Sequence, residues 1–217
     1  MSIGSPSHWA AALKREWMLY HLGDPRFAFM WDEPPKDEWV SFDCETTGLN
    51  TTTDDIISIG AVRIRGNRIM TTERLNLLVR PEKKRLSADS VKVHRLREQD
   101  VAQGMSADEA VMQLMHFMGS RPLVGYFLEF DVAMVNRVLF PILGMGLPQP
   151  KIEVSALYYD YKLNKTPHHA RDSRAIDLRF DNILKELDLP VWPAHDALND
   201  AIMAALAFLK LRELMAK

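Results

Sequence analysis

Apolar and polar residues alternate from Glu38 onward, and this alternation predicts a strand. The apolar side of this strand holds Val40, Phe42 and Cys44, and the polar side holds Ser41, Asp43 and Glu45. Two more strands are predicted at 56–64 and 69–79, and the pair Gly66-Asn67 between them suits a tight hairpin turn. The pattern therefore predicts an antiparallel meander of three strands.

Downstream of the meander the apolar period lengthens, which predicts helices alternating with short strands. The predicted helices cover about 107–118, 129–139, 176–187 and 196–215, and the predicted strands cover 122–126 and about 152–157. A meander followed by alternating helices and strands indicates an α/β fold, in which helices cover both faces of a mixed sheet.

An apolar helical face is also predicted upstream of the meander. Its residues recur at three- or four-residue spacing: Trp9, Leu13, Trp17 and Tyr20. Pro34 and Pro35 discourage continuation of a helix. We therefore expect an N-terminal helical extension at 1–36 and a main domain at 37–217. The apolar face either braces its own domain or binds a partner.

Composition narrows the classes of protein to consider. The chain has 217 residues, 47% of them hydrophobic and 26% charged, which is enough to bury a full core. No apolar run approaches the roughly 20 residues that span a bilayer, and the first residues lack the blocks of a signal peptide. We expect no membrane partner and a cytoplasmic location. The single cysteine, Cys44, excludes an internal disulfide and a Cys-based zinc site.

The net charge of −2 is unlike that of tight non-specific duplex binders, which release counterions from many phosphates. An enzyme of this charge that acts on nucleic acid would hold a few phosphates locally and use bound metal for positive charge. Two basic stretches, 80–97 and 162–174, either contact nucleic acid or form a solvated charged surface.

Asp43 and Glu45 stand two residues apart near the end of the first predicted strand. Both carboxylates then project from the same face, about 6 to 7 Å apart at the backbone, where they can chelate one cation together. A polar turn follows at 46–49, where Gly48 permits a tight bend and hydroxyl groups can meet a substrate. The alternative is a pair of solvated acids at a strand end.

Three further residues extend this candidate site. Asp131 lies near the start of the predicted helix 129–139, where the helix dipole alone would also favour an acid. Asp200 lies in an otherwise apolar helix, so a buried carboxylate there needs a partner such as a metal ion. His195 stands just before that helix and, with an unperturbed pKa near 6.5, can accept a proton at physiological pH.

The segments that carry these residues resemble the three motifs of the DEDDh exonuclease family. This family includes the DnaQ-like (epsilon) proofreading subunit of bacterial replicative polymerase, oligoribonuclease and ribonuclease T. The segments are FDCETTGL at 42–49, GYFLEFD at 125–131 and HDALNDA at 195–201, and the resemblance covers 38–214. It implies a ribonuclease H-like fold and a 3′→5′ exonuclease that releases nucleoside 5′-monophosphates from a single-stranded 3′ end.

The resemblance also implies a role for each site residue. Asp43 would bridge two metal ions, Glu45 and Asp200 would complete one metal site, and Asp131 would hold the second ion through water. His195 would be the general base. Two cations in one site activate water and neutralise the charge on phosphate, and carboxylate ligands favour Mg²⁺ or Mn²⁺.

Three residues outside this set are expected near the substrate. The resemblance places Thr46 near the terminal sugar and His94 near the terminal base, and Leu49, which closes the first motif, is a further candidate contact. Where the family commonly has Gly-His-Asn, this chain has Gly125-Tyr126-Phe127. This departure changes the contacts to substrate rather than the chemistry.

Phe127 is a fourth candidate for substrate contact. It stands four residues before Asp131 and would share its side of the helix if the first turn begins that early. Its ring could then stack on a base near the 3′ end. The alternative is that Phe127 packs into the core.

Three functions remain open on this evidence. The leading hypothesis is a stand-alone exonuclease that trims DNA, in repair or replication, and the second is a proofreading subunit docked to a DNA polymerase. The third is a catalytically silent nucleic-acid-binding module, against which the presence of all five key residues argues. The choice between DNA and RNA depends on contacts to the 2′-hydroxyl.

Overall fold

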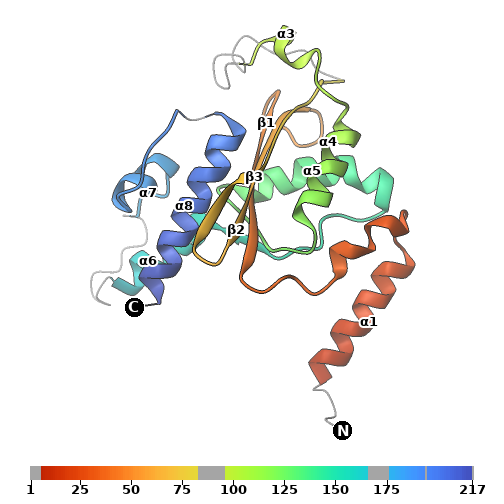
Figure 1. The fold of residues 1–217 in the computed structure, drawn as a ribbon, viewed down its shortest axis with the longest axis horizontal. Helices are drawn as coiled ribbons and strands as arrows, with labels where there is room; N and C mark the ends of the chain where they lie inside the picture. The colour runs from red at the N-terminus through yellow and green to blue at the C-terminus, as the bar shows by residue number, and fades with distance from the viewer. Residues whose placement is uncertain (1–5, 83–95, 166–175, 194, 217) are drawn as a thin grey trace.

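The computed structural model describes residues 6–82, 96–165, 176–193 and 195–216, with only the backbone for 6–12. The helices are α1 (Pro6–Tyr20), η1 (Pro25–Trp31), α3 (Glu98–Val101), α4 (Ala107–Met118), α5 (Leu128–Leu143), α6 (Val154–Lys165), α7 (Phe180–Glu186) and α8 (Ala197–Met215). The strands are β1 (Glu38–Thr46), β2 (Ile56–Arg65), β3 (Arg68–Leu78), β4 (Leu123–Gly125) and β5 (Lys151–Glu153) (Figure 1).

The strands form one mixed sheet in the order β3-β2-β1-β4-β5. β1 pairs antiparallel with β2, and β2 with β3, whereas β1 pairs parallel with β4, and β4 with β5. Gly66 has φ of +57° in the turn between β2 and β3, a conformation that glycine adopts at little cost. The predicted meander, hairpin and mixed sheet are confirmed.

Helices cover both faces of the sheet (Figure 1). On one face, α4, α5 and η1 pack over a core that includes Phe42 and Ala61. On the other, α6, α7 and α8 pack over a core that includes Val62 and Val124. Ala61 and Val62 are neighbours in β2, are both fully buried and point to opposite cores, as the alternation of side chains along a strand requires.

One predicted element was wrong. The strand expected at about 152–157 ends at Glu153, and α6 begins at the next residue. The helix has few buried positions, chiefly Val154 and Tyr158, so its apolar stripe is narrow. The aromatic residues around Tyr158 also have high strand propensity, which favoured the wrong assignment.

The predicted apolar face of α1 does not brace the main domain in the part that the structure describes. Leu13, Trp17 and Tyr20 are largely exposed, and Figure 1 shows α1 leading away from the sheet. The helix is held instead by its neighbouring face, where Arg15 donates to the Trp31 carbonyl at 2.9 Å. The Trp9 side chain lies outside the described residues.

The segment between α1 and β1 belongs to the main core. Phe27 and Met30 of η1 are buried in the same cluster as Val40 and Phe42 of β1. The division at residue 36 therefore separates sequence patterns, whereas the core continues across it. The proposed boundary stays a prediction.

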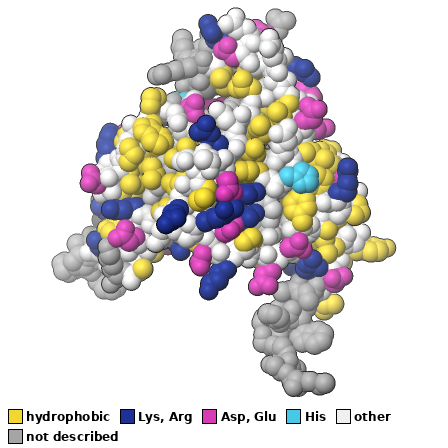
Figure 2. Space-filling model, viewed as in Figure 1, with side chains coloured by type: hydrophobic (Ala, Val, Ile, Leu, Met, Phe, Trp, Pro, Cys, Tyr) yellow, Lys and Arg dark blue, Asp and Glu magenta, His cyan; other side chains and the backbone are white. Residues whose placement is uncertain are grey.

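Basic and acidic side chains lie side by side on the face drawn in Figure 2. Arg65 forms ion pairs with Glu38 at 3.1 Å and Glu73 at 2.8 Å. The two basic stretches at 80–97 and 162–174 fall largely outside the described residues. Among the described helices none is long and apolar enough to cross a membrane, and the predicted cytoplasmic location stays a prediction.

Candidate active site

A close approach between α8 and β2 brings distant parts of the sequence together. A Cβ atom on Gly60 would lie 2.2 Å from the backbone of Ala197 and Leu198, so only glycine allows the start of α8 to rest on the sheet here. Gly60 pairs with Asp43 of β1. The first turn of α8 therefore lies beside the acidic end of β1.

A second contact attaches α5 to the same end of β1. The backbone N–H of Cys44 donates to Asp131 Oδ1 at 3.1 Å, and Asp131 is only 4% exposed. Cys44 stands between Asp43 and Glu45, so this bond sets the carboxylate of Asp131 beside both. The three acids meet because the sheet order places β1 at its centre.

The start of α8 holds the remaining two residues of the predicted site. Asp196 caps the helix by accepting from the Asn199 N–H at 2.9 Å. The backbone N–H of His195 donates to Asp200 Oδ2 at 2.9 Å, which leaves Oδ1 buried and without a hydrogen-bond partner. A buried carboxylate oxygen with no donor calls for another source of positive charge.

All five predicted residues line one pocket of about 250 Å³. Side-chain ligand atoms of Glu45, His195 and Asp200 lie within 4.8 Å of one another. His195, whose ring is exposed, has φ of 68°, a left-handed conformation that is uncommon for a residue with a side chain. Strained conformations of this kind cluster at functional sites.

The pocket acids raise one another's pKa. Burial raises the pKa of Asp43 well above its ordinary value, and the carboxylates of Asp131 and Asp200 add to the effect. Burial, with help from Asp200, raises the pKa of Glu45 to about 8. Burial also raises the pKa of Asp131 and of Asp200, although the bonds from the Cys44 and His195 backbones oppose it.

This electrostatic balance fits a divalent cation. None of the described residues that line the pocket is Lys or Arg, and His195 is the one described lining residue that can carry positive charge beside the acids. The ligand atoms are carboxylate oxygens with one imidazole nearby, a set suited to hard divalent ions. Positive charge in the pocket would give the unpaired Oδ1 of Asp200 an electrostatic partner and would reduce the repulsion among the acids.

Aromatic rings form the other wall of this pocket. Tyr126 stacks on Phe180 with centroids 4.5 Å apart, and Phe127 lies nearly parallel to Phe130 at 6.0 Å. The Tyr126 hydroxyl donates to the Leu178 carbonyl at 3.1 Å, which ties the segment before α7 to the end of β4. We call these four rings the aromatic wall.

Phe127 does not lie within α5. The helix begins at Leu128, and Phe127 is its N-cap residue with φ of 56°. Phe127 is 65% exposed, so the alternative that it packs into the core is wrong. It nevertheless lines the same pocket as Asp131.

The other three predicted substrate contacts differ in their exposure and in whether the structure describes them. Thr46 is buried, and its hydroxyl donates to the Gly48 carbonyl at 2.6 Å. Leu49 is 83% exposed at the tip of the loop that follows β1. His94 lies outside the described residues. The contribution of each to substrate binding stays a prediction.

Four pocket residues were absent from the predicted site: Cys44, Tyr126, Phe130 and Phe180. Tyr126 and Phe130 flank predicted residues in the second motif, so their position was available as a signal. Phe180 comes from α7 and reaches the pocket only through the packing of α7 beside α6 and α8. No local pattern in the sequence marks it.

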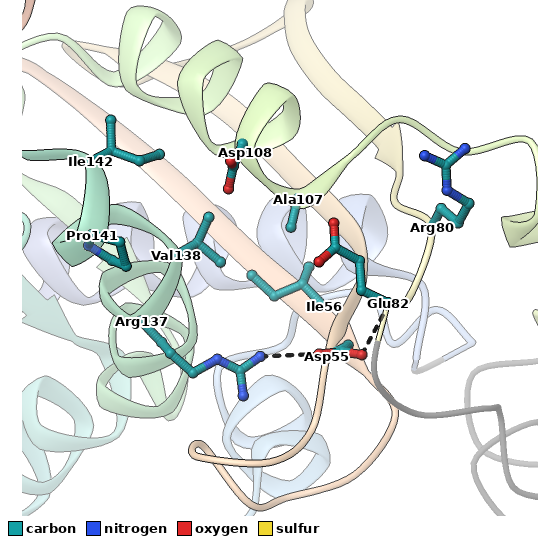
Figure 3. A pocket seen from close by; sticks show the side chains of 10 residues that line it. All are labelled: Asp55, Ile56, Arg80, Glu82, Ala107, Asp108, Arg137, Val138, Pro141 and Ile142. Carbon is teal, nitrogen blue, oxygen red and sulfur yellow. Dashed lines mark hydrogen bonds and ion pairs between the residues drawn. The ribbon is translucent and has the colours of Figure 1, made fainter.

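A second cavity, of about 190 Å³, lies between the loop that follows β1 and the helices α4 and α5 (Figure 3). Two of its charged residues, Arg137 and Asp55, form an ion pair and also bond to the backbone. Arg137 reaches Asp55 at 3.4 Å and the Thr51 carbonyl at 3.2 Å, and Asp55 also accepts from the Glu82 N–H at 3.1 Å. These contacts fix the loop at 47–55.

Comparison with known proteins identifies the family. A family model described as Exonuclease matches residues 40–208. The chain belongs to this exonuclease family. The match confirms the predicted resemblance and the predicted enzyme class.

Curated relatives are much longer than this chain. The DNA polymerase III PolC-type protein of Thermotoga maritima is 27% identical over 179 residues, which is 82% of this chain and 12% of that protein. The DNA polymerase III subunit epsilon-like protein of Rhodobacter capsulatus is 29% identical over 182 residues, covering 82% of this chain and 24% of that protein.

Solved structures share the fold. The zinc-bound complex of E. coli ExoI with single-stranded DNA has a TM-score of 0.69 at 13% identity, covering 83% of this chain and 41% of that chain. Exonuclease X in complex with 5′ overhanging duplex DNA has a TM-score of 0.60 at 21% identity, covering 82% and 93%. The predicted ribonuclease H-like α/β fold is confirmed.

Proposed function

We propose that this chain is a metal-dependent 3′→5′ exonuclease that removes nucleoside 5′-monophosphates from single-stranded DNA ends. The observation that carries the proposal is the pocket itself, in which acids with no described Lys or Arg beside them share the lining with aromatic rings. The acids suit a phosphodiester and its metal ions, and the rings suit unpaired bases. The ExoI relative of the same fold is a complex with single-stranded DNA, which supports this substrate.

Each pocket residue then has a task. Asp43, Glu45 and Asp200 would hold one divalent ion, and Asp43 with Asp131 would hold a second, as Mg²⁺ or Mn²⁺. When bound, such ions make water easier to deprotonate and neutralise the charge that develops on phosphate. His195, exposed at the edge of the pocket, accepts the proton of the attacking water.

The aromatic wall accounts for a preference for single strands. Base stacking on an aromatic ring is worth about 1 to 3 kcal/mol and is indifferent to sequence. Phe127 is the most accessible of the rings, and only a base that has left its duplex presents a free face to it. The bound strand would therefore lie across Phe127, with its terminal phosphodiester at the acids.

Digestion of end-labelled strands tests this proposal. A 5′-labelled single strand should shorten one nucleotide at a time when Mg²⁺ is added and should stay intact with a chelator. A blunt duplex of the same sequence should be cut more slowly, and a matched RNA strand measures the preference for DNA. Two results would rule the proposal out. One is that a 3′-labelled strand yields shortened oligonucleotides that keep the label. The other is cleavage that persists without divalent ions.

A second candidate function, a proofreading subunit docked to a DNA polymerase, is favoured by the exposed face of α1. Leu13, Trp17 and Tyr20 offer an apolar helical surface, and the relatives in which this domain occurs include far longer polymerases. Co-purification with the polymerase of the same cell tests it. Changing Trp17 and Tyr20 to Glu should abolish binding while the exonuclease rate stays unchanged.

A further inference from the structure

Glu153 joins the end of β5 to the start of α5. Its carboxylate accepts two hydrogen bonds, from the Phe127 N–H at 3.2 Å and from the Leu128 N–H at 2.9 Å. The first N–H groups of a helix have no partner within the helix and are usually satisfied by a side chain at the N-cap. The N-cap residue here is Phe127, whose ring makes no such bond. Glu153 of β5 instead supplies an acceptor to the N–H groups of Phe127 and of Leu128, the first helical residue.

The Glu153 carboxylate is itself fixed. Its Oε1 also accepts from the Ser155 N–H at 3.0 Å and from the Ser155 hydroxyl at 2.7 Å. Glu153 pairs with Gly125 in the sheet, so the carboxylate stands directly beside the end of β4. A half-buried acid with four donors around it is a rigid support for the turn between β4 and α5.

That turn needs support because Phe127 adopts a left-handed conformation, with φ of 56° and ψ of 32°. An aromatic residue pays a conformational penalty there, so the surrounding contacts must hold it. The conformation is also what leaves the Phe127 ring exposed at the pocket mouth while Leu128 turns into the core.

The same turn determines where Asp131 points. Each residue rotates an α-helix by about 100°. A start of α5 shifted by one residue would therefore turn Asp131 away from the Cys44 N–H and the other acids. We propose that Glu153 is a positioning residue that fixes the positions of both the Phe127 ring and the Asp131 carboxylate. This inference rests on the proposed function, in which Phe127 meets a base and Asp131 a metal ion.

Variants separate positioning from a simple effect of charge. Glu153→Ala removes every acceptor, whereas Glu153→Gln removes the charge and keeps one acceptor oxygen. Glu129→Gln removes a charge from the same first turn of α5 at an exposed position and is the control. The Glu153 carboxylate lies close enough to Asp131 to interact with its charge, so an effect of lost charge alone would be the same in both Glu153 variants.

The readouts are Mn²⁺ affinity without substrate, by calorimetry, and KM for a single-stranded oligonucleotide and for a p-nitrophenyl ester of thymidine 5′-monophosphate. Glu153→Ala should weaken Mn²⁺ binding by about 10- to 100-fold, the usual effect of losing a group that orients a metal ligand. It should raise KM for the oligonucleotide more than for the ester, because only the oligonucleotide reaches Phe127. Glu153→Gln should restore part of both losses, and Glu129→Gln should change neither.

Two outcomes would overturn the inference. One is a Glu153→Ala protein with wild-type Mn²⁺ affinity and wild-type KM values. The other is equal loss in Glu153→Gln and Glu153→Ala. If Glu153→Ala does not fold, Ser155→Ala, which removes one donor to the carboxylate, should show the same paired losses at smaller size. Wild-type protein that neither binds Mn²⁺ nor cleaves would instead refute the proposed function.

Discussion

Two cavities of this protein contain buried acids, and they differ in whether an arginine lies beside the acid. In the cavity of Figure 3, Asp55 faces the guanidinium of Arg137 and accepts a backbone hydrogen bond. In the acidic pocket, Asp43, Glu45 and Asp131 face one another, and no described Lys or Arg lines the walls. Burial is similar, since Asp55 and Glu45 are each 8% exposed.

This difference distinguishes a structural acid from a functional one. A buried carboxylate with its own cation stabilises the loop that it joins, and nothing further is required of it. Buried carboxylates left without a cation destabilise the metal-free protein. Such an arrangement is suited to a ligand from solution that supplies positive charge, and we propose that this ligand is a divalent ion.

The largest expected effect separates the two cavities by activity. Asp43→Ala and Asp200→Ala should each abolish turnover, because each removes a proposed metal ligand. Asp55→Ala should keep most of the turnover and lose about 1 to 3 kcal/mol of stability, since Arg137 loses one of its two acceptors and the Glu82 N–H loses its acceptor. Rates and melting temperatures check both. More than about a tenth of the wild-type rate in Asp43→Ala would argue against the metal assignment.

The next effect concerns His195, which is exposed beside the acids. His195→Ala should lower the maximal rate by roughly 10² to 10⁴, the usual contribution of a general base, and leave Mn²⁺ affinity unchanged. The dependence of the rate on pH should differ in shape between wild type and the variant. A variant that loses Mn²⁺ affinity instead would make His195 a ligand, which its distance from Glu45 and Asp200 allows.

A smaller effect is expected at the aromatic wall. Phe127→Ala should raise KM for a single-stranded oligonucleotide by about 5- to 150-fold, which corresponds to the 1 to 3 kcal/mol of one stacked base. A small nucleotide ester should be cleaved as by wild type, and the melting temperature should hold because the ring is exposed. An unchanged KM for the oligonucleotide would remove Phe127 from the substrate path.

The smallest effect is on the stability of the metal-free protein. The folded pKa of Glu45, at about 8, lies above its unfolded value, so its stabilising contribution is complete below about pH 4.5 and is lost as pH rises through 8. Melting temperature without metal should fall across this range by roughly 6 to 12 °C, for a loss on the order of 3 kcal/mol. Mg²⁺ should restore it at pH 8, and Glu45→Gln should flatten the slope. A wild-type melting temperature that is constant from pH 5 to 8 would contradict the pKa assigned to Glu45.

The fold was predictable where local pattern and packing agree. The alternation in β1 and the apolar run of β2 both mark their strands in the sequence. The sequence also indicated which acids to examine, because Asp200 sits in an apolar helix. It gave no sign that α6 begins directly after β5, since only two of its residues are buried.

Details of the site that depend on distant contacts were not predictable. The position of Phe127 outside α5 depends on its contact with Glu153, which stands 26 residues further along the chain. Phe180 joins the pocket through the packing of α7. The exposure of α1 depends on which of its faces meets Trp31, and its apolar spacing suggested the other face.

Direct measurement of bound metal tests the central claim, that the acids of the pocket, which have no described Lys or Arg beside them, hold divalent ions. Calorimetry with Mn²⁺ and a single strand protected by phosphorothioate at its 3′ end should give about two ions per chain. Asp55→Ala should give the same number, and Asp43→Ala should give fewer. Wild-type protein that binds no Mn²⁺, or Asp43→Ala protein that binds as many ions as wild type, would contradict the account.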